Sequence, residues 1–218
     1  MTKPLQALLD DPRLWRAGRR TRHWPTLPSG YPRLDALLPG GGWPAGMLTE
    51  VAVERWGSGE LALFMPLLAR LSGDENGHAT GWITWVSPPF LPYAPALAAA
   101  GVNLAQLLLV HGQNDAESLW AAEQALQSRS CRVVLAWAER ADGRCLRRLQ
   151  LAAESSRTPL ILFRPPAALA APSPAALRLS LDADADADTD AGAGGVCLRL
   201  VKHRGGAAQC LPVAALHE

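Results

Sequence analysis

Apolar and polar positions follow two alternating periods along the chain, and this alternation predicts strands separated by helices. Short continuous apolar runs predict buried strands; they cover residues 48–54, 81–86, 107–111, 132–138 and 159–163. Segments with apolar residues at helical spacing predict helices between them; they cover residues 60–71, 91–100, 115–127 and 143–155. We expect Pro66 to kink the first helix and Asp115 to cap the third. The pattern is typical of the α/β class, with a mainly parallel sheet flanked by helices on both faces.

The C-terminal part departs from this alternation. Residues 177–181 and 196–202 are two strand-like runs, which predict an antiparallel hairpin that extends the sheet. Between them, aspartates alternate with small residues and then run into glycines, so we expect a flexible acidic loop over residues 182–195. Calcium binding by these carboxylates is an alternative, although the glycine and terminal glutamate of an EF-hand loop are missing.

Length and composition are those of one soluble globular domain. The chain has 218 residues, of which 49% are hydrophobic and 19% are charged. We divide it into a basic N-terminal segment, residues 1–28, and a domain over residues 29–218. Apolar stretches are too short or too interrupted to span a bilayer, and the first residues do not form a secretory signal, so we expect a cytoplasmic location.

The cysteines show no metal-binding or disulfide signature. They lie far apart, without a C-x-x-C pair and without a histidine at metal-ligand spacing, and are Cys131, Cys145, Cys197 and Cys210. In a cytosolic protein this arrangement predicts four reduced, structural thiols.

Glycines and apolar residues at fixed offsets mark residues 27–50. The run contains Leu27-Pro28-Ser29-Gly30, Leu34-Asp35, Gly41-Gly42, Pro44, Gly46 and Glu50. It resembles the entry to the ATP-binding core of RecA-type recombinases. Over nearly the whole chain, including residues 198–206, the sequence resembles the ImuA family of RecA-like accessory proteins in bacterial translesion mutagenesis. Its middle is also similar to the SulA family of cell-division inhibitors, which the SOS response induces.

The resemblance places a phosphate loop directly after the first strand of the domain, and this loop is degenerate. A functional loop needs glycine N–H groups around the phosphates, a lysine for their charge and a Ser or Thr hydroxyl for Mg²⁺. The segment here holds two glycines but no lysine, and consists of Glu54, Arg55, Trp56, Gly57, Ser58, Gly59, Glu60 and Leu61. Because Glu54 and Glu60 repel phosphate, we expect no nucleotide-binding site, although Arg55 partly offsets the repulsion.

Two further positions implied by the resemblance also lack their chemistry. Ser87-Pro88-Pro89 stands where a water-activating acid is expected, and proline offers no proton acceptor. Ala136, Trp137 and Ala138 stand at the magnesium-side position, with Glu139 out of register. The histidines show no metal or triad spacing, and Ser58 lacks the flanking glycines of a nucleophile elbow. We therefore predict no catalytic residue, no cofactor, no metal site and no enzyme activity.

Tryptophans and basic residues are the remaining candidates for contact with a partner. Four tryptophans in predicted strands or helices are expected in the core: Trp82, Trp85, Trp120 and Trp137. Four in basic or turn-rich segments are expected as interface anchors: Trp15, Trp24, Trp43 and Trp56. Our candidates for partner or DNA contact are Trp15, Arg16, Arg19, Arg20, Trp56, Arg199, Lys202 and Arg204. A solvated N-terminal arm, packing of Trp56 onto its own domain, and a solvated C-terminal hairpin remain alternatives.

The resemblance to ImuA implies a non-catalytic adaptor in SOS-induced translesion DNA synthesis after DNA damage. The implied partner is an ImuB-type polymerase-like protein, with RecA or an error-prone polymerase as further candidates, DNA as a weak one, and no membrane. The alternative is a SulA-like inhibitor that blocks polymerisation of the tubulin-like division protein. A third hypothesis is a weak ATPase or a DNA-binding RecA paralogue.

Overall fold

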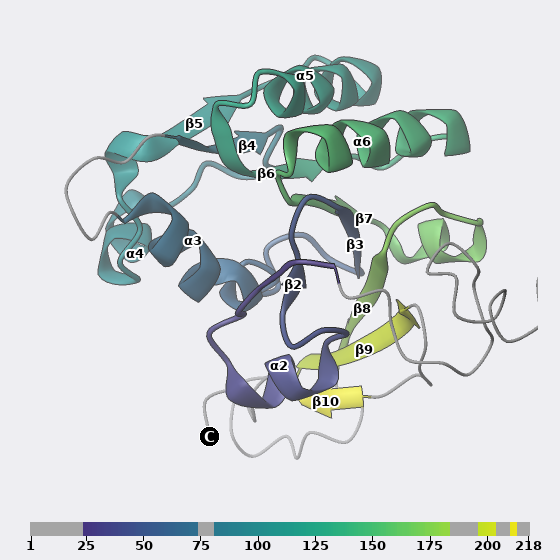
Figure 1. Ribbon diagram of the computed structural model, residues 1–218, viewed down its shortest axis with the longest axis horizontal. Coiled ribbons are helices and arrows are strands. Elements are labelled where there is room, and N and C mark those ends of the chain that lie inside the picture. Colours follow the sequence, from purple (N-terminus) through teal and green to yellow (C-terminus); the bar gives the residue numbers. More distant parts are fainter. Residues whose placement is uncertain (1–23, 74–80, 184–195, 204–209, 213–218) are drawn as a thin grey trace, which may run out of the picture.

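A computed structural model describes residues 24–73, 81–183, 196–203 and 210–212 (Figure 1). Its strands are β1 (Thr26–Leu27), β2 (Trp43–Pro44), β3 (Leu48–Val53), β4 (Trp82–Val86), β5 (Leu107–Val110), β6 (Cys131–Trp137), β7 (Leu160–Arg164), β8 (Leu177–Ala183), β9 (Val196–His203) and β10 (Cys210–Pro212). Its α-helices are α2 (Pro32–Leu37), α3 (Met65–Ser72), α4 (Ala94–Ala99), α5 (Asp115–Gln127) and α6 (Gly143–Ser156). Three 3₁₀ turns complete the described part: η1 (Ala62–Phe64), η2 (Leu104–Gln106) and η3 (Pro166–Ala170).

The main sheet has eight strands in the order β10-β9-β8-β3-β7-β6-β4-β5. All pairs from β8 to β5 are parallel, whereas β9 runs antiparallel to β8 and to β10. The prediction of an α/β fold with a mainly parallel sheet and a C-terminal antiparallel hairpin is therefore confirmed.

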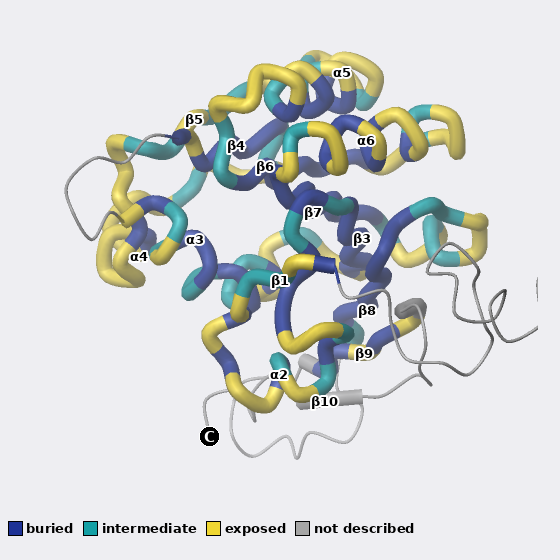
Figure 2. The backbone as a smooth tube through the Cα atoms, in the orientation of Figure 1, coloured by how far each residue is buried: buried dark blue, intermediate teal, exposed yellow. Residues whose placement is uncertain are grey.

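Helices cover the sheet on both faces because its strands are apolar on both sides. On one face α5 and α6 lie side by side, and on the other lie α3 and α4 (Figure 1). Two buried clusters correspond to these faces, one around Phe64, Trp85 and Phe163 and the other around Leu126 and Leu149. The central strands are buried along their length, and the exposed residues lie on the outer faces of the helices and in the loops (Figure 2).

A buried charge cluster ties three central strands together. Glu50 in β3 pairs with Arg164 in β7 at 3.0 Å and with Arg178 in β8 at 2.9 Å. These three side chains are at most 7% exposed. Arg178 also donates hydrogen bonds to carbonyls of the segment after β7, including that of Ala168 at 2.8 Å. The cluster therefore fixes the segment after β7 against the sheet.

Several local expectations need correction. Pro66 does not kink a helix: it stands in the first turn of α3, where its missing N–H costs no hydrogen bond. The N-cap of α5 is Asn114, whose side chain accepts from the N–H of Glu117, and Asp115 is the first helical residue. Asp182 belongs to β8 and not to the predicted acidic loop, the rest of which lies largely outside the described residues.

Two of the four tryptophans predicted for the core are buried, and two of those predicted as interface anchors are buried instead of exposed. Trp85 and Trp137 are buried as predicted, but Trp82 and Trp120 are 41% and 59% exposed. Trp24 and Trp43, predicted as interface anchors, are 6% and 2% exposed. Trp43 is buried because the glycine turn before β3 folds its ring onto Phe64, with 4.6 Å between ring centroids.

The cysteine prediction is wrong for one residue. Cys131 and Cys145 are free, whereas Cys197 in β9 is disulfide-bonded. Sequence spacing does not reveal such a pairing because strand register, and not separation along the chain, decides which thiols meet.

In the part of the chain that the structure describes, no helix is long and apolar enough to cross a membrane.

Candidate functional site

The degenerate phosphate loop, residues 54–61, follows β3 at the carboxyl edge of the parallel strands. This edge is where open α/β sheets bind ligands. Gly57 and Gly59 adopt φ of +83° and +99°, so both glycines are required for the turn. The ends of β4, β6 and β7 lie along the same edge.

The carboxylate of Glu60 fills the inside of this loop. Glu60 is 3% exposed, and its Oε1 accepts a hydrogen bond of 3.0 Å from the N–H of Gly57. Its Oε2 is buried and finds no hydrogen-bond donor among the described residues. A main-chain donor that could face a phosphate is therefore already bound to an internal anion, and a second anion there is repelled.

The other side chains of the loop face outward or onto the core. Glu54 and Arg55 are exposed, whereas Trp56 is half-buried and packs against the cluster around Phe64. Trp56 therefore packs onto its own domain, as the alternative interpretation proposed, although part of the indole remains at the surface.

The end of β4 carries a serine in place of an acid. Ser87 has φ of +52°, a conformation that non-glycine residues adopt only when the surroundings hold them. Its hydroxyl accepts from the N–H of Gly112 at 3.0 Å and shares a 2.6 Å hydrogen bond with the hydroxyl of Ser118. Ser87 thus connects the ends of β4 and β5 to α5, and its hydroxyl is used in this connection.

The end of β6 is occupied by a structural link. Glu139 is exposed, and its main-chain N–H donates to the Asp115 carboxylate at 3.3 Å. The N–H of Arg140 donates to the same carboxylate at 2.8 Å. Asp115 therefore ties the loop after β6 to the start of α5.

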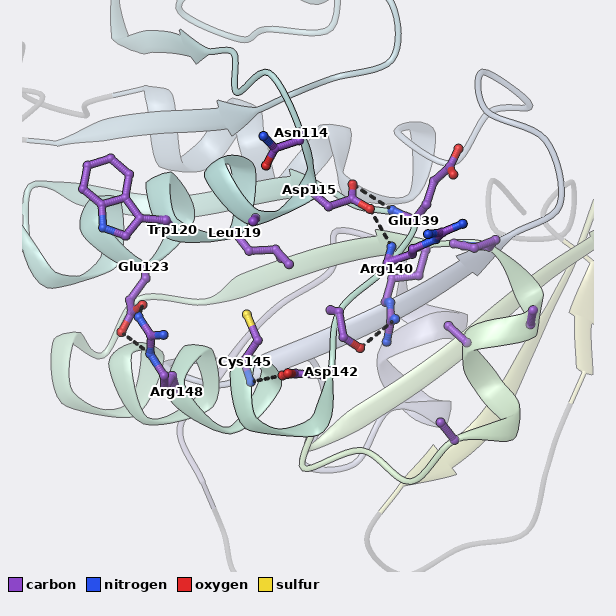
Figure 3. A pocket seen from close by; sticks show the side chains of 17 residues that line it. Asn114, Asp115, Leu119, Trp120, Glu123, Glu139, Arg140, Asp142, Cys145 and Arg148 are labelled. Carbon is purple, nitrogen blue, oxygen red and sulfur yellow. Dashed lines mark hydrogen bonds and ion pairs between the residues drawn. The ribbon is translucent and has the colours of Figure 1, made fainter.

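A groove of about 1080 Å³ lies between α5, the start of α6 and the segment after β7. Trp120, Glu123 and Arg148 lie at one end, and Asp115, Glu139 and Arg140 lie at the other (Figure 3). Glu123 and Arg148 form an ion pair at the first end. Burial, and then the charge of Asp142, raise the pKa of the Cys145 thiol, so this cysteine is a poor nucleophile. Within the described residues, no group of His, Cys, Asp or Glu could hold a metal ion.

The remaining predicted contact residues are placed only in part. Trp15, Arg16, Arg19, Arg20 and Arg204 lie outside the described residues. Lys202 lies in β9 opposite Arg178 of β8. Arg199 is exposed and pairs with Asp182 at 3.0 Å.

One feature of this edge was not predicted from the sequence. Phe90, Leu91 and Tyr93, which follow the end of β4, are 62%, 83% and 72% exposed. The available signal was the run of prolines around them at positions 88, 89, 92 and 95, which does not favour the helix predicted from residue 91.

Taken together, these features define an α/β protein whose carboxyl edge contains a closed, acid-filled loop. No family model matches the chain. Over 141 residues it is 36% identical to "Protein ImuA" of Caulobacter vibrioides, in strain NA1000 / CB15N and equally in strain ATCC 19089 / CIP 103742 / CB 15. This match covers 63% of the chain and 56% of ImuA, so the chain spans little more than half the length of these relatives.

A second relative is "Cell division inhibitor SulA" of Edwardsiella piscicida, 30% identical over 105 residues. That match covers 48% of this chain and 60% of SulA. Among solved structures, that of SulA from Pseudomonas aeruginosa matches with 24% identity and a TM-score of 0.45, over 56% of this chain and 98% of that one. By sequence, the chain is thus similar to ImuA and, over a shorter stretch, to SulA, as its motifs predicted.

Proposed function

We propose that this protein is a non-catalytic adaptor in SOS-induced translesion DNA synthesis and mutagenesis. Its similarity to ImuA supports this role, with an ImuB-type protein as the partner and with RecA or an error-prone polymerase as further candidates. We further propose that residues 29–218 form a RecA-like domain that acts in the cytoplasm, and that the basic segment 1–28 contributes to partner contact.

The observation that carries the non-catalytic part is the position of Glu60. The N–H of Gly57 is bound to this buried carboxylate, and no lysine stands in the loop. ATP would have to displace an internal anion and would then lack the positive charge that phosphates need. Ser87 at the end of β4 has a hydroxyl committed to Ser118 and Gly112, so it does not serve as a general base.

The experiment is the ultraviolet-induced mutation frequency of a strain that lacks the gene, scored at equal survival against its parent. We expect induced mutations to fall to the level of untreated cells and to return when the wild-type gene is supplied on a plasmid. An unchanged frequency in the deletion strain would refute the role in lesion bypass.

The biochemical part has its own test. Purified wild-type protein should show no ATP hydrolysis above buffer and no thermal stabilisation by ATP and Mg²⁺. Either signal would instead support a weak ATPase or a DNA-binding RecA paralogue.

The second candidate function is inhibition of cell division, which the similarity to SulA favours. It predicts that overproduction makes cells filamentous, and that the purified protein blocks polymerisation of the tubulin-like division protein. The adaptor role predicts neither result, so these two experiments distinguish the two functions.

A further inference from the structure

The strongest unexplained surface is the loop that follows β4. We define the proline-rich loop as residues 88–93, whose exposed apolar side chains are Phe90, Leu91 and Tyr93. Large apolar side chains with most of their surface in water are unfavourable unless something covers them. Three such side chains within four positions form a local patch, unlike isolated exposed apolar residues.

The loop is held in one conformation from both ends. The Phe90 ring lies against Gly57, since a Cβ at Gly57 would be 3.0 Å from the Phe90 ring. The carbonyl of Tyr93 accepts hydrogen bonds from the N–H groups of Ala96 and Leu97, at 3.1 and 3.2 Å, and so starts α4. Pro88, Pro89 and Pro92 restrict the main chain between these two anchors. A fixed conformation lowers the entropy cost of binding.

The stretch of sequence that contains this loop has no charged residue. From Asn76 to Asn114 the sequence holds no Asp, Glu, Lys or Arg. The same stretch holds the exposed alanines of α4 and two further leucines, Leu104 and Leu108, which are 38% and 40% exposed. Protein interfaces are depleted of charge at their centre and enriched in aromatic residues, which is the composition found here.

Nucleic acid does not match this chemistry. Exposed Phe and Tyr rings can stack on bases, but binding to single strands also needs a basic path for the phosphates. The charge-free stretch supplies no Lys or Arg, and the nearest basic residue of the neighbouring loop, Arg55, stands beside Glu54.

We propose that the proline-rich loop is a docking element that inserts Phe90 and Leu91 into an uncharged apolar pocket of a partner protein. We expect this pocket to be uncharged because residues 76–114, which contain the loop, offer no counter-ion to a charge buried against them. This inference rests on the proposed adaptor function for the choice of partner, but not for the surface itself.

The test compares single variants of the full chain in binding to two purified proteins. These are the ImuB-type protein and the tubulin-like division protein of the same organism. Phe90→Ser and Leu91→Ser remove the two anchors, and Leu151→Ser is the matched control, since Leu151 is a 46% exposed leucine on α6. Thermal unfolding of each variant checks that the fold is intact, and sedimentation and a fluorescent single-stranded oligonucleotide report self-association and DNA binding.

We expect Leu91→Ser and Phe90→Ser each to weaken binding to the ImuB-type protein by roughly tenfold or more. The Leu151→Ser variant should bind within about twofold of the wild type. If the division protein is the one bound through the loop, the docking element stands and the lesion-bypass function fails. The proposal itself is refuted if neither protein binds, if the loop variants bind like the control, or if their only loss is in self-association or DNA binding.

Discussion

The buried cluster of Glu50, Arg164 and Arg178 allows a quantitative test of what holds the three central strands together. Replacing Glu50 by Gln keeps the size of the side chain but removes the only negative charge of the cluster. Two arginines that are 7% and 6% exposed would then face each other without a counter-ion. Breaking a buried ion pair from one side costs about 3–5 kcal/mol, which is a large part of the usual stability of a domain.

The matched control is the ion pair of Asp182 and Arg199. Their side chains are 32% and 55% exposed, so water screens the pair and Asp182→Asn should cost at most about 1 kcal/mol. Urea unfolding followed by tryptophan fluorescence measures both variants, with the midpoint and the slope fitted separately. If Glu50→Gln unfolds within about 1 kcal/mol of the wild type, the cluster does not stabilise the sheet in the way described here.

Three further predictions concern single positions. Gly30→Ala should lower the unfolding free energy by about 2 kcal/mol or more in urea titration, because Gly30 has φ of +91° and a Cβ there would lie 2.3 Å from Cβ of Pro66; an unchanged midpoint would contradict this packing. Glu60→Gln should bind inorganic triphosphate roughly tenfold more tightly than the wild type in calorimetry, because one repelling charge is gone; Glu54→Gln, on the outside of the loop, should change less. The raised pKa of Cys145 means less thiolate at any given pH, so iodoacetamide at pH 8 should modify it more slowly than an unstructured cysteine peptide, as mass spectrometry of the labelled site can show.

Sequence pattern predicted the order and type of the main elements because local and global preferences agree there. The strand after the glycine turn, β3, and the helix α5 begin within one residue of their predicted starts. The errors fall where tertiary packing decides. Pro66 lies in the first turn of α3 because the preceding residues form η1. α4 begins only at Ala94 because, in a helix that started at Leu91, Pro95 would lack the N–H that donates to the carbonyl of Leu91.

The sequence predicted which chemical groups the site lacks, but it did not predict the geometry of the site. The missing lysine and the prolines after β4 can be read from the chain. That Glu60 turns inward to bind Gly57, and does not point to solvent, depends on two glycines with positive φ and on the packing of Leu63 and Phe64 below the loop. The exposure of Trp120 likewise follows from which side of α5 faces α6, and helical spacing alone left this open.

The same carboxylate that removes the nucleotide site gives the edge a constant shape. A phosphate-binding loop without its ligand has main-chain donors that no protein group satisfies, and its conformation therefore depends on nucleotide. Here Glu60 satisfies the N–H of Gly57 from within the chain, and Gly57 in turn supports the ring of Phe90. A surface built on such a loop is present at all times and needs no ATP to form it. A surface of constant shape suits the proposed adaptor, whereas a nucleotide-controlled switch needs a surface that changes when ATP binds. Glu60 therefore both removes the phosphate-binding site and, through Gly57, supports Phe90 in the proposed binding surface.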